Sequence, residues 1–392
     1  TTVTTTLAPT TTAPAPTTTA GTTTTAAPAT TTTVPSFPDA LGMTWERLAA
    51  DPVFDDAWIT AVTTGGPGLV AVGYVLEEPW PADWYSDAAV WVSSDGLAWE
   101  RVDVAAALFP DGRTTASDEF LLDVWEGGDG LIAVGYDWPH PAHWTSPDGR
   151  NWSRVEPALV GFPGRVLEVG GRLVTVGADG LWYSDDGVTW TRATGDVFRL
   201  AEVYDAVAAG PGVVAVGRVI GLENPTSAIW VSSDGVEWTL IQEGPVGLET
   251  QFEQVAASPH GTRILAFGWD HALVSADGAS WEVAEAPFGS PPAGSRTAWD
   301  GDRLVVVGRT WGSAAGVWVS DDGGATLYRL GRGDPAFVAD TPDISDVVLF
   351  GSRFIAVGGD RGSLQEGQIP GGSPMIGADG RGAVWIGTWD QD

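Results

Sequence analysis

A short apolar segment that ends in glycine recurs seven times along the chain. Short runs rich in valine, isoleucine and leucine are typical of strands that are buried on both faces of a sheet. The glycines lie 40 to 62 residues apart, which indicates a repeated structural unit. The seven copies are GLVAVGY (68–74), GLIAVGY (130–136), RLVTVGA (172–178), GVVAVGR (212–218), RILAFGW (263–269), RLVVVGR (303–309) and RFIAVGG (353–359).

A second recurrent segment follows six of these copies and carries a Ser-x-Asp-Gly sequence. The Asp-Gly pair predicts a tight turn between two antiparallel strands. Shorter runs upstream of the apolar segment, such as ITAV (59–62), YDAV (204–207) and ISDV (344–347), supply one more strand for each unit. The six copies are VWVSSDGLAW (90–99), HWTSPDGRNW (143–152), LWYSDDGVTW (181–190), IWVSSDGVEW (229–238), ALVSADGASW (272–281) and VWVSDDGGATL (317–327).

Each unit therefore contains four antiparallel strands. A lone four-stranded sheet with two apolar faces cannot bury them, so successive sheets must stack, and a radial stack closes into a propeller. The seventh unit ends at AVWIGTWDQD (383–392) without a fourth strand, whereas GMTWERL (42–48) matches GLAWERV (96–102) and has no strands before it. We predict an all-β, seven-bladed β-propeller of four-stranded antiparallel blades over residues 38–392. The N-terminal strand, at about 43–49, is predicted to be the outer strand of blade 7.

Residues 1–37 have a different composition, dominated by threonine with alanine and proline. Such a segment has little apolar surface to bury and cannot repay the entropy of ordering, so we predict a disordered stalk. Thr/Pro-rich stalks are often O-glycosylated, although an unmodified tail fits equally well. We expect an extracytoplasmic bacterial protein, secreted or anchored at the cell surface, from which an N-terminal targeting or anchoring segment has been removed.

Composition narrows the range of partners. The chain has 51 acidic and 19 basic residues, all of the basic ones arginine, for a net charge of −32. A nucleic-acid partner is excluded because phosphate binding needs a clustered basic surface. The chain has no cysteine, so disulfides and thiol chemistry are excluded, and no apolar run reaches the roughly 20 residues of a membrane span. We expect a monomer without a cofactor or bound metal. Whether the acidity serves solubility in salt, weak Ca²⁺ capture or a cationic partner stays open.

The Ser-x-Asp-Gly turn resembles the Asp-box, or BNR repeat, of the sialidase-like propellers, often written Ser-x-Asp-x-Gly-x-Thr-Trp. Residues 320–327 match its full length, with Leu327 in place of the tryptophan, and the other copies are one residue shorter. We expect each aspartate to accept hydrogen bonds from its own turn and each glycine to adopt a positive φ. The tryptophans after the turns, and Trp45 by closure, are expected to fill the gaps between blades. The structural aspartates are Asp95, Asp148, Asp186, Asp234, Asp277 and Asp322.

The resemblance implies that a functional site lies on the face opposite these turns. That face is formed by the loops after the apolar segments and by the links between blades, where this sequence is least repetitive. Aromatic rings beside polar groups are suited to stacking on sugars or anchoring peptides, although they also serve to pack loops together. The candidate ligand-binding residues are Tyr74, Trp80, Trp84, Tyr85, Tyr136, Trp138, Arg218, Trp269, His271, Arg309 and Trp311.

An active sialidase would need more than this fold. The resemblance implies three arginines around the substrate carboxylate, a tyrosine nucleophile that passes its proton to a glutamate, and an aspartate that acts as the acid. The Arg-Ile-Pro motif of that family is missing, and only Arg218 and Arg309 suggest themselves as clamp residues. Glu77, Glu78 and Asp83 offer a carboxylate pair for another glycoside. His140, His143 and His271 lack the spacing of a metal site. We favour a non-catalytic propeller that binds a glycan or an extracytoplasmic envelope protein; the alternative is a secreted sialidase-like glycoside hydrolase.

Overall fold

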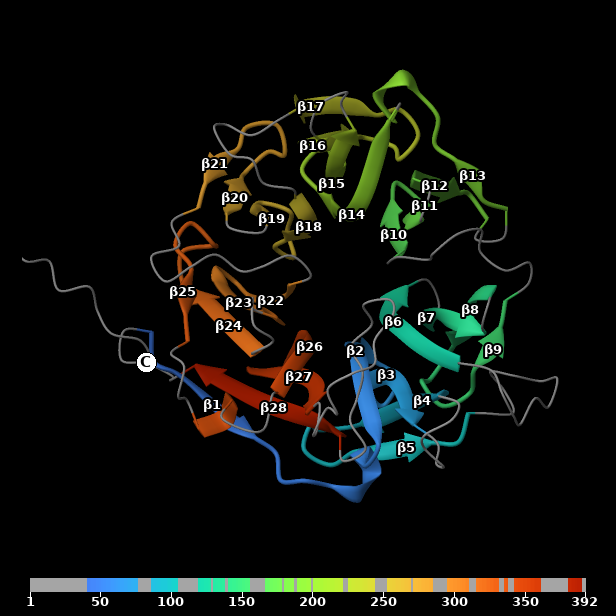
Figure 1. Cartoon of the computed structure of the whole chain (residues 1–392), viewed down its shortest axis with the longest axis vertical. Coiled ribbons are helices and arrows are strands. Elements are labelled where there is room, and N and C mark those ends of the chain that lie inside the picture. The colour runs from blue at the N-terminus through green and yellow to red at the C-terminus, as the bar shows by residue number, and fades with distance from the viewer. Residues whose placement is uncertain are drawn as a thin grey trace, which may run out of the picture. The chain divides into compact units, whose positions relative to one another are not determined.

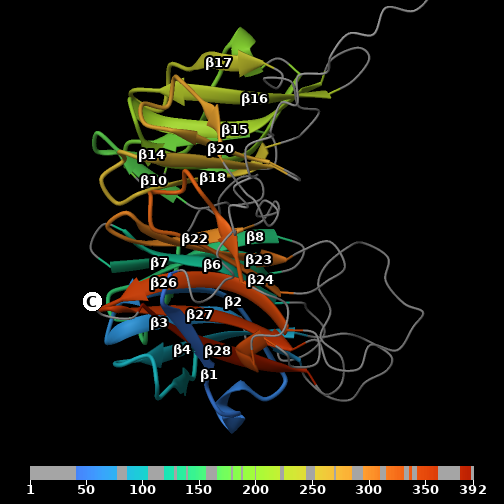
Figure 2. The ribbon, with the colours of Figure 1, turned by 90° about the vertical axis from the view of Figure 1, so that its left-hand side faces the viewer.

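Seven four-stranded antiparallel sheets surround one axis in the computed structural model, and each sheet is one blade of a propeller (Figure 1). The predicted fold is confirmed. The structure describes residues 41–389 except 77–85, 105–118, 128–129, 138–139, 156–165, 178–179, 187–188, 199, 221–224, 244–251, 269–270, 285–294, 310–314, 331–334, 338–341 and 361–379. Figure 2 shows the sheets from the side, stacked one upon another. Within the described residues there is no helix with the length and apolar character needed to span a membrane.

The first four blades follow one another along the chain, and each runs from an inner strand to an outer one. Blade 1 contains β2 (Ala57–Gly65), β3 (Gly68–Leu76), β4 (Ser86–Ser93) and β5 (Glu100–Val102). Blade 2 contains β6 (Glu119–Gly127), β7 (Gly130–Asp137), β8 (His140–Ser146) and β9 (Ser153–Arg154). Blade 3 contains β10 (Val166–Val169), β11 (Arg172–Gly177), β12 (Gly180–Ser184) and β13 (Thr191–Arg192). Blade 4 contains β14 (Ala201–Ala209), β15 (Gly212–Ile220), β16 (Pro225–Ser232) and β17 (Thr239–Glu243).

The last three blades repeat this order, and blade 7 takes its outer strand from the start of the chain. Blade 5 contains β18 (Phe252–Ala257), β19 (Ile264–Gly268), β20 (Ala272–Ser275) and β21 (Glu282–Val283). Blade 6 contains β22 (Arg296–Asp300), β23 (Arg303–Arg309), β24 (Ala315–Ser320) and β25 (Tyr328–Arg329). Blade 7 contains β26 (Pro342–Phe350), β27 (Arg353–Asp360), β28 (Arg381–Trp389) and β1 (Met43–Arg47).

The two ends of the propeller pair as predicted. β1 runs antiparallel to β28, with Met43 opposite Trp389 and Arg47 opposite Trp385. The backbone N–H of Leu48 extends this ladder by donating to the carbonyl of Val384 at 3.0 Å. An ion pair between Arg47 and Asp360 of β27 adds a side-chain contact. The first strand therefore completes the last blade and closes the ring.

Seven clusters of buried apolar side chains form the core among the described residues, and each lies between two neighbouring blades. In each blade a large side chain directly before the outer strand, or within it in the case of β1, packs into the cluster between that blade and the preceding one. These side chains are Trp45, Trp99, Trp152, Trp190, Trp238, Trp281 and, in blade 6, Leu327. The residues after the turns thus fill the gaps between blades, and truncating a tryptophan in such a place costs about 3–5 kcal/mol.

The inner strands are longer than the sequence indicated because most contain a β-bulge. β2 spans nine residues where four were expected, and its pairing with β3 shifts between Ile59 and Ala61. Equivalent shifts interrupt β6, β14, β18 and β26. A bulge inserts one unpaired residue and reverses the alternation of side chains, so the strand appears in the sequence only from the bulge onward.

In four blades the bulge also explains the glycine that ends the apolar segment. A Cβ on Gly73, Gly135, Gly217 or Gly358 would lie 1.9–2.0 Å from a carbonyl oxygen of the inner strand. No side chain fits at that distance, because the bulge presses the backbone of one strand onto the next. Blade 6 has no such shift in its pairing, and there a Cβ on Gly308 would instead meet the Ser295 hydroxyl at 2.7 Å.

Among the described residues, three links between blades contain a short 3-10 helix with phenylalanine at its end: η1 (Pro52–Phe54), η2 (Asp196–Phe198) and η3 (Pro335–Phe337). In the first, Phe54 packs against both Trp91 and Trp99, and the carbonyl of Val53 accepts a hydrogen bond from the Trp91 indole at 2.9 Å. Phe198 and Phe337 make matching contacts in blades 4 and 7. In these blades the link that precedes the first strand is therefore packed against the tryptophans of the third strand and of the turn or strand that follows it.

Candidate functional site

In the Ser-x-Asp-Gly turns, the serine and aspartate side chains form hydrogen bonds with the backbone of their own turn. In blade 1, the Asp95 carboxylate accepts hydrogen bonds from the N–H groups of Leu97 and Ala98 at 2.8 and 3.0 Å. The Ser93 hydroxyl accepts from Gly96, whose φ of 76° favours glycine. The Trp99 indole closes the turn by donating to the Gly96 carbonyl at 3.2 Å. At least one backbone N–H of the turn donates in the same way to each of Asp148, Asp186, Asp234, Asp277 and Asp322.

These hydrogen bonds stabilise the charged form of the aspartates. Backbone N–H groups of Asn151 and Arg150 lower the pKa of Asp148 to about 2. The pKa of Asp95, Asp234 and Asp277 is lowered by the same kind of backbone donors. The backbone donors of each turn converge on one oxygen of its carboxylate, Oδ1, which fixes the side chain against its own turn. The arrangement therefore acts as a structural element.

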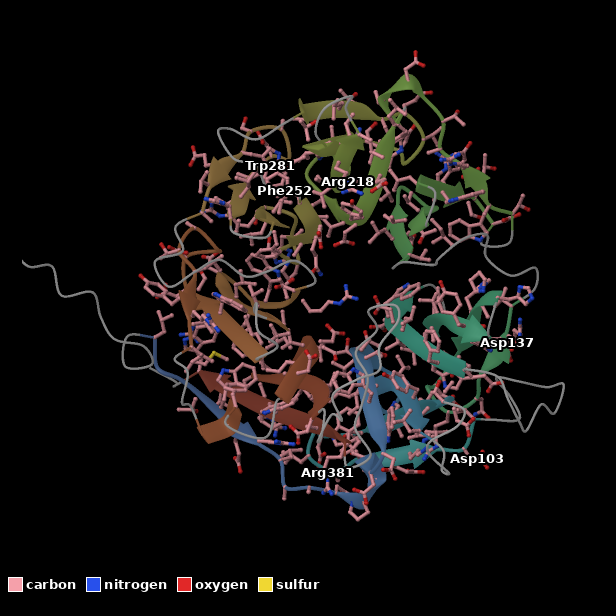
Figure 3. The ribbon with its side chains drawn as sticks, in the orientation of Figure 1. Asp103, Asp137, Arg218, Phe252, Trp281 and Arg381 are labelled. Atoms are coloured by element: carbon pink, nitrogen blue, oxygen red, sulfur yellow. The ribbon has the colours of Figure 1, made fainter. Side chains whose placement is uncertain are left out.

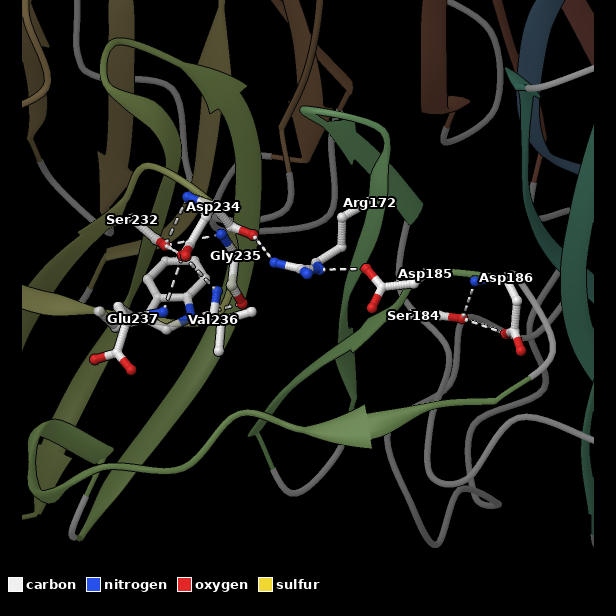
Figure 4. A network of polar contacts seen from close by, with 10 residues as sticks. Arg172, Ser184, Asp185, Asp186, Ser232, Asp234, Gly235, Val236 and Glu237 are labelled. Carbon is white, nitrogen blue, oxygen red and sulfur yellow. Dashed lines mark hydrogen bonds and ion pairs between the residues drawn. The ribbon is translucent and has the colours of Figure 1, made fainter.

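The turns are also joined to the preceding blade. Arg172 of blade 3 donates from Nε to the Asp185 carboxylate at 2.7 Å and from Nη1 to the carbonyl of Asp234 in blade 4 at 3.0 Å (Figure 4). Arg353 of blade 7 reaches the carbonyl of Asp95 in blade 1 in the same way, at 2.9 Å. Both arginines begin an apolar segment. This recurrent position is the signal by which the sequence reveals these contacts.

Most of the predicted ligand-binding residues lie outside the described part of the chain. Arg309 belongs to β23, but its side chain is likewise outside the description. Tyr74, Tyr136, Arg218 and His271 are described, and they come from blades 1, 2, 4 and 5. The undescribed candidates are Trp80, Trp84, Tyr85, Trp138, Trp269 and Trp311, together with the acids Glu77, Glu78 and Asp83.

Two of the described candidates meet across the first pair of blades. The Phe120 ring lies between Tyr74 of blade 1 and Tyr136 of blade 2, with centroid distances of 6.3 and 5.1 Å. Tyr136 is buried, and this burial raises the pKa of its phenol to about 12. Tyr74 is half-buried. Of these two rings, Tyr74 is therefore the one with surface to offer a ligand.

Arg218 forms a polar cluster with Glu202 and Tyr204 on blade 4. The position of Arg218 is shown in Figure 3. Arg218 Nε donates to Glu202 Oε2 at 2.6 Å, and the Tyr204 hydroxyl donates to the same oxygen at 2.9 Å. The guanidinium lies over the Tyr204 ring, 5.7 Å from its centroid. Hydrogen bonds from Tyr204 and Arg218 lower the pKa of Glu202, whereas burial and Glu202 raise that of Tyr204 to about 12. All three side chains are partly exposed.

The histidines are not gathered into a metal site. His271 is half-buried in blade 5, whereas His143 is buried and His140 is exposed at the start of β8 in blade 2. Among the residues that the structure describes, no group of three or more histidine, aspartate or glutamate side chains has the arrangement of a metal site.

A row of polar residues on the inner strands was missed by the sequence analysis. In each case the residue pairs with the one before the glycine of the apolar segment, so the row occupies one level of the ring. Asp346 shows what the position does: its carboxylate accepts from its neighbour Val347 at 2.9 Å and from Val62 of the next blade at 3.0 Å. Asp205 bridges blades 4 and 5 likewise. The row consists of Asp123, Asp205, Gln254, Arg296 and Asp346, and in blade 1 the same position is occupied by the apolar Ala61.

Arg296 connects blades that are not neighbours. Its Nη2 lies 3.4 Å from the Asp123 carboxylate, which joins blade 6 to blade 2, so this ion pair spans the axis of the ring. Burial lowers the pKa of Arg296, but the charges of Asp123, Asp346 and Asp205 outweigh it and raise that pKa. Asp123 and Asp346 are buried, and 28% of the Arg296 side chain is exposed. A charged residue within a strand that is otherwise apolar was the available sequence signal.

The chain was compared with family models, curated proteins and solved structures. No family model matches the chain, and no curated protein matches its sequence. A protein of unknown function from Dyadobacter fermentans is 17% identical, with 89% of this chain and 100% of that chain covered and a TM-score of 0.46. Sqt1 of Saccharomyces cerevisiae is 10% identical, with 78% of this chain and 80% of Sqt1 covered and a TM-score of 0.45. A third structure is the extracellular domain of a B. thetaiotaomicron protein that is described as a one component system. It is 9% identical, with 80% of this chain and 38% of that chain covered and a TM-score of 0.48.

Proposed function

We propose that the protein is an extracytoplasmic, non-catalytic propeller of the Asp-box type, which binds a glycan or an envelope protein through the face opposite its Ser-x-Asp-Gly turns. Residues 1–37 would serve as a disordered stalk for the propeller of residues 38–392. The threonine- and proline-rich composition supports the stalk and the extracytoplasmic location. The six turns, each with its aspartate bound to its own backbone, support the resemblance to Asp-box propellers.

One observation favours binding over hydrolysis. A sialidase-like mechanism requires arginines whose guanidinium groups grip the carboxylate of the substrate. Arg218, one of the two arginines that suggested themselves for that task, is instead fastened to Glu202 and stacked on Tyr204. Releasing it would break a charge-assisted hydrogen bond, which is worth about 1.5–3 kcal/mol. A rigid surface of arginine and tyrosine is well suited to contact with a sugar ring or a protein side chain, because little entropy is lost on binding.

The alternative is a secreted sialidase-like glycoside hydrolase, and the Tyr204–Glu202 hydrogen bond is the feature that favours it. The pairing matches the tyrosine and glutamate that the resemblance implies for the nucleophile. The shifts in pKa oppose the role, however. A lowered pKa makes Glu202 a weaker base, and the raised pKa of Tyr204 makes its phenol harder to ionise than that of an ordinary tyrosine. The non-catalytic proposal is therefore the better supported one.

A glycan array, combined with a panel of chromogenic glycosides, tests the proposal. We expect binding without turnover, and loss of binding in Trp80→Ala or Trp84→Ala. Leu97→Ala is the control, since Leu97 is exposed on a Ser-x-Asp-Gly turn and lies on the opposite face. Turnover of any glycoside that is abolished by Arg218→Ala or Tyr204→Phe would establish the hydrolase instead.

A further inference from the structure

The inner edge of blade 4 begins with a residue in an unusual backbone conformation. Leu200 has a φ of 61°, in the left-handed region that favours glycine. Asp56 has a φ of 56° at the matching place in blade 1, two residues after the phenylalanine of the link. The carbonyl of each accepts a hydrogen bond from the second strand of its blade, Leu200 from Ile220 at 2.6 Å and Asp56 from Leu76 at 2.9 Å. The fold therefore requires this conformation at both places.

The identity of the residue at this position is not explained by the fold. Aspartate tolerates the left-handed conformation through its short polar side chain, whereas leucine is a costly choice. The Leu200 side chain is also 61% exposed, so it contributes little to the core. Its hydrogen-bonded neighbour Ile220 is 38% exposed. Leu200 and Ile220 are hydrogen-bonded neighbours, so together they offer an exposed aliphatic surface to which a partner could add the contacts that the fold does not.

Charged groups lie directly beside this apolar pair. Glu202 and Arg218 face each other two register positions further along β14 and β15, past the Ala201–Val219 pair, and Tyr204 completes their cluster. Glu253 of blade 5 also acts on Tyr204 through its charge. Two carboxylates therefore accompany one guanidinium, on a chain whose net charge is −32. The potential at this surface attracts positive charge.

We propose that Leu200, Ile220, Glu202, Arg218 and Tyr204 form a docking surface, the blade 4 patch, for a protein segment with an apolar side chain next to lysine or arginine. The apolar residue covers Leu200 and Ile220, and the basic residue approaches the exposed carboxylate of Glu202. This inference rests on the proposed binding function and names the class of partner. A protein segment fits this patch better than a glycan, because Leu200 and Ile220 present aliphatic rather than aromatic surface and the Arg218 guanidinium is already paired with Glu202.

Leu200→Gly separates binding from folding. Glycine adopts a φ of 61° without strain, so this variant should melt at the same temperature as the wild type or higher while it loses the apolar anchor. Asp56→Gly is the matched backbone control, because it relieves the same conformation in blade 1 and leaves the patch intact. Leu97→Ala removes an exposed leucine from the opposite face. The probe is a phage-displayed library of short random peptides, panned on the immobilised full chain, with enriched peptides synthesised and titrated by calorimetry.

We expect the enriched peptides to share an apolar residue beside lysine or arginine and to bind more weakly as salt is raised. Leu200→Gly should raise their Kd by about tenfold or more, with both controls unchanged. The inference is wrong if no peptide is enriched, if enriched peptides lack basic residues, or if they bind the Leu200→Gly variant equally well. A lower melting temperature for Leu200→Gly would likewise contradict it, since Leu200 would then have a structural role. A glycan that binds independently of Leu200 would overturn this inference and leave the proposed function intact.

Discussion

The ion pair across the axis predicts a specific loss of stability. Replacing Arg296 by glutamine removes the cation that faces Asp123, Asp205 and Asp346 and leaves those carboxylates to repel one another. At 3.4 Å and an effective dielectric constant of about 20, the attraction to Asp123 alone is about 5 kcal/mol, and desolvation offsets part of it. Because removal of one partner from a buried pair costs about 3–5 kcal/mol, and Arg296 keeps 28% exposure, we expect a loss of about 3 kcal/mol.

Thermal unfolding measures this loss. With an unfolding entropy of about 2.1 cal/mol/K for each residue, a propeller of this length should melt about 4 °C lower. Arg150→Gln is the matched control: Arg150 pairs with Glu100 at 2.8 Å, but both side chains are exposed, at 42% and 63%. It should change the melting temperature little and have no effect in about 1 M NaCl, whereas the Arg296 variant should remain destabilised in salt.

A double-mutant cycle isolates the contact itself. Asp123→Asn should cost less in the Arg296→Gln background than in the wild type, with a coupling energy of at least about 1 kcal/mol. The reasoning would be refuted by a coupling within about 0.3 kcal/mol of zero, or by equal melting temperatures for the Arg296 and Arg150 variants. Either result would mean that Arg296 is solvated and that the blades are joined by their apolar interfaces alone.

Three further predictions follow from the blades and turns. Gly135→Ala should lower the melting temperature strongly or prevent folding, because its Cβ would lie 2.0 Å from a carbonyl oxygen, whereas Gly127→Ala, with its nearest contact at 3.4 Å, should be mild. The pKa of Asp148 is about 2 in the folded state, below its ordinary 3.8, so its contribution is present above about pH 4 and is lost as the pH falls towards 2. The stability gap between the wild type and Asp148→Asn, about 1 kcal/mol after solvent screening, should therefore close over that range in a pH series of melting curves. Deletion of residues 38–49 should lower the melting temperature, since it removes β1 and the Trp45 side chain between blades 6 and 7; an unchanged value would contradict the closure of the ring.

The sequence alone determined the number of blades, the order of their strands and the way the ring closes. These features follow from local patterns: an apolar run marks a buried strand, Asp-Gly marks a tight turn, and the missing fourth strand of the last unit matches the surplus strand at residues 42–48. The place of Trp99 between blades was also predictable, because a large side chain after every turn needs a gap to fill. Each of these inferences depends on neighbours in the chain or on counting repeats.

Only the tertiary structure decided which residues meet at the axis and along the blade edges. Nothing in the local sequence of Asp123 indicates that it faces Arg296, since that contact arises only when blades 2 and 6 are placed on the same ring. The requirement for glycine at Gly217 likewise comes from a bulge in the neighbouring strand. A bulge is difficult to recognise in a sequence because it breaks the alternation of apolar and polar residues. The left-handed φ of Leu200 is likewise evident only in the three-dimensional structure. Contacts between distant strands depend on the closed geometry of the whole ring, and no short stretch of sequence encodes that geometry.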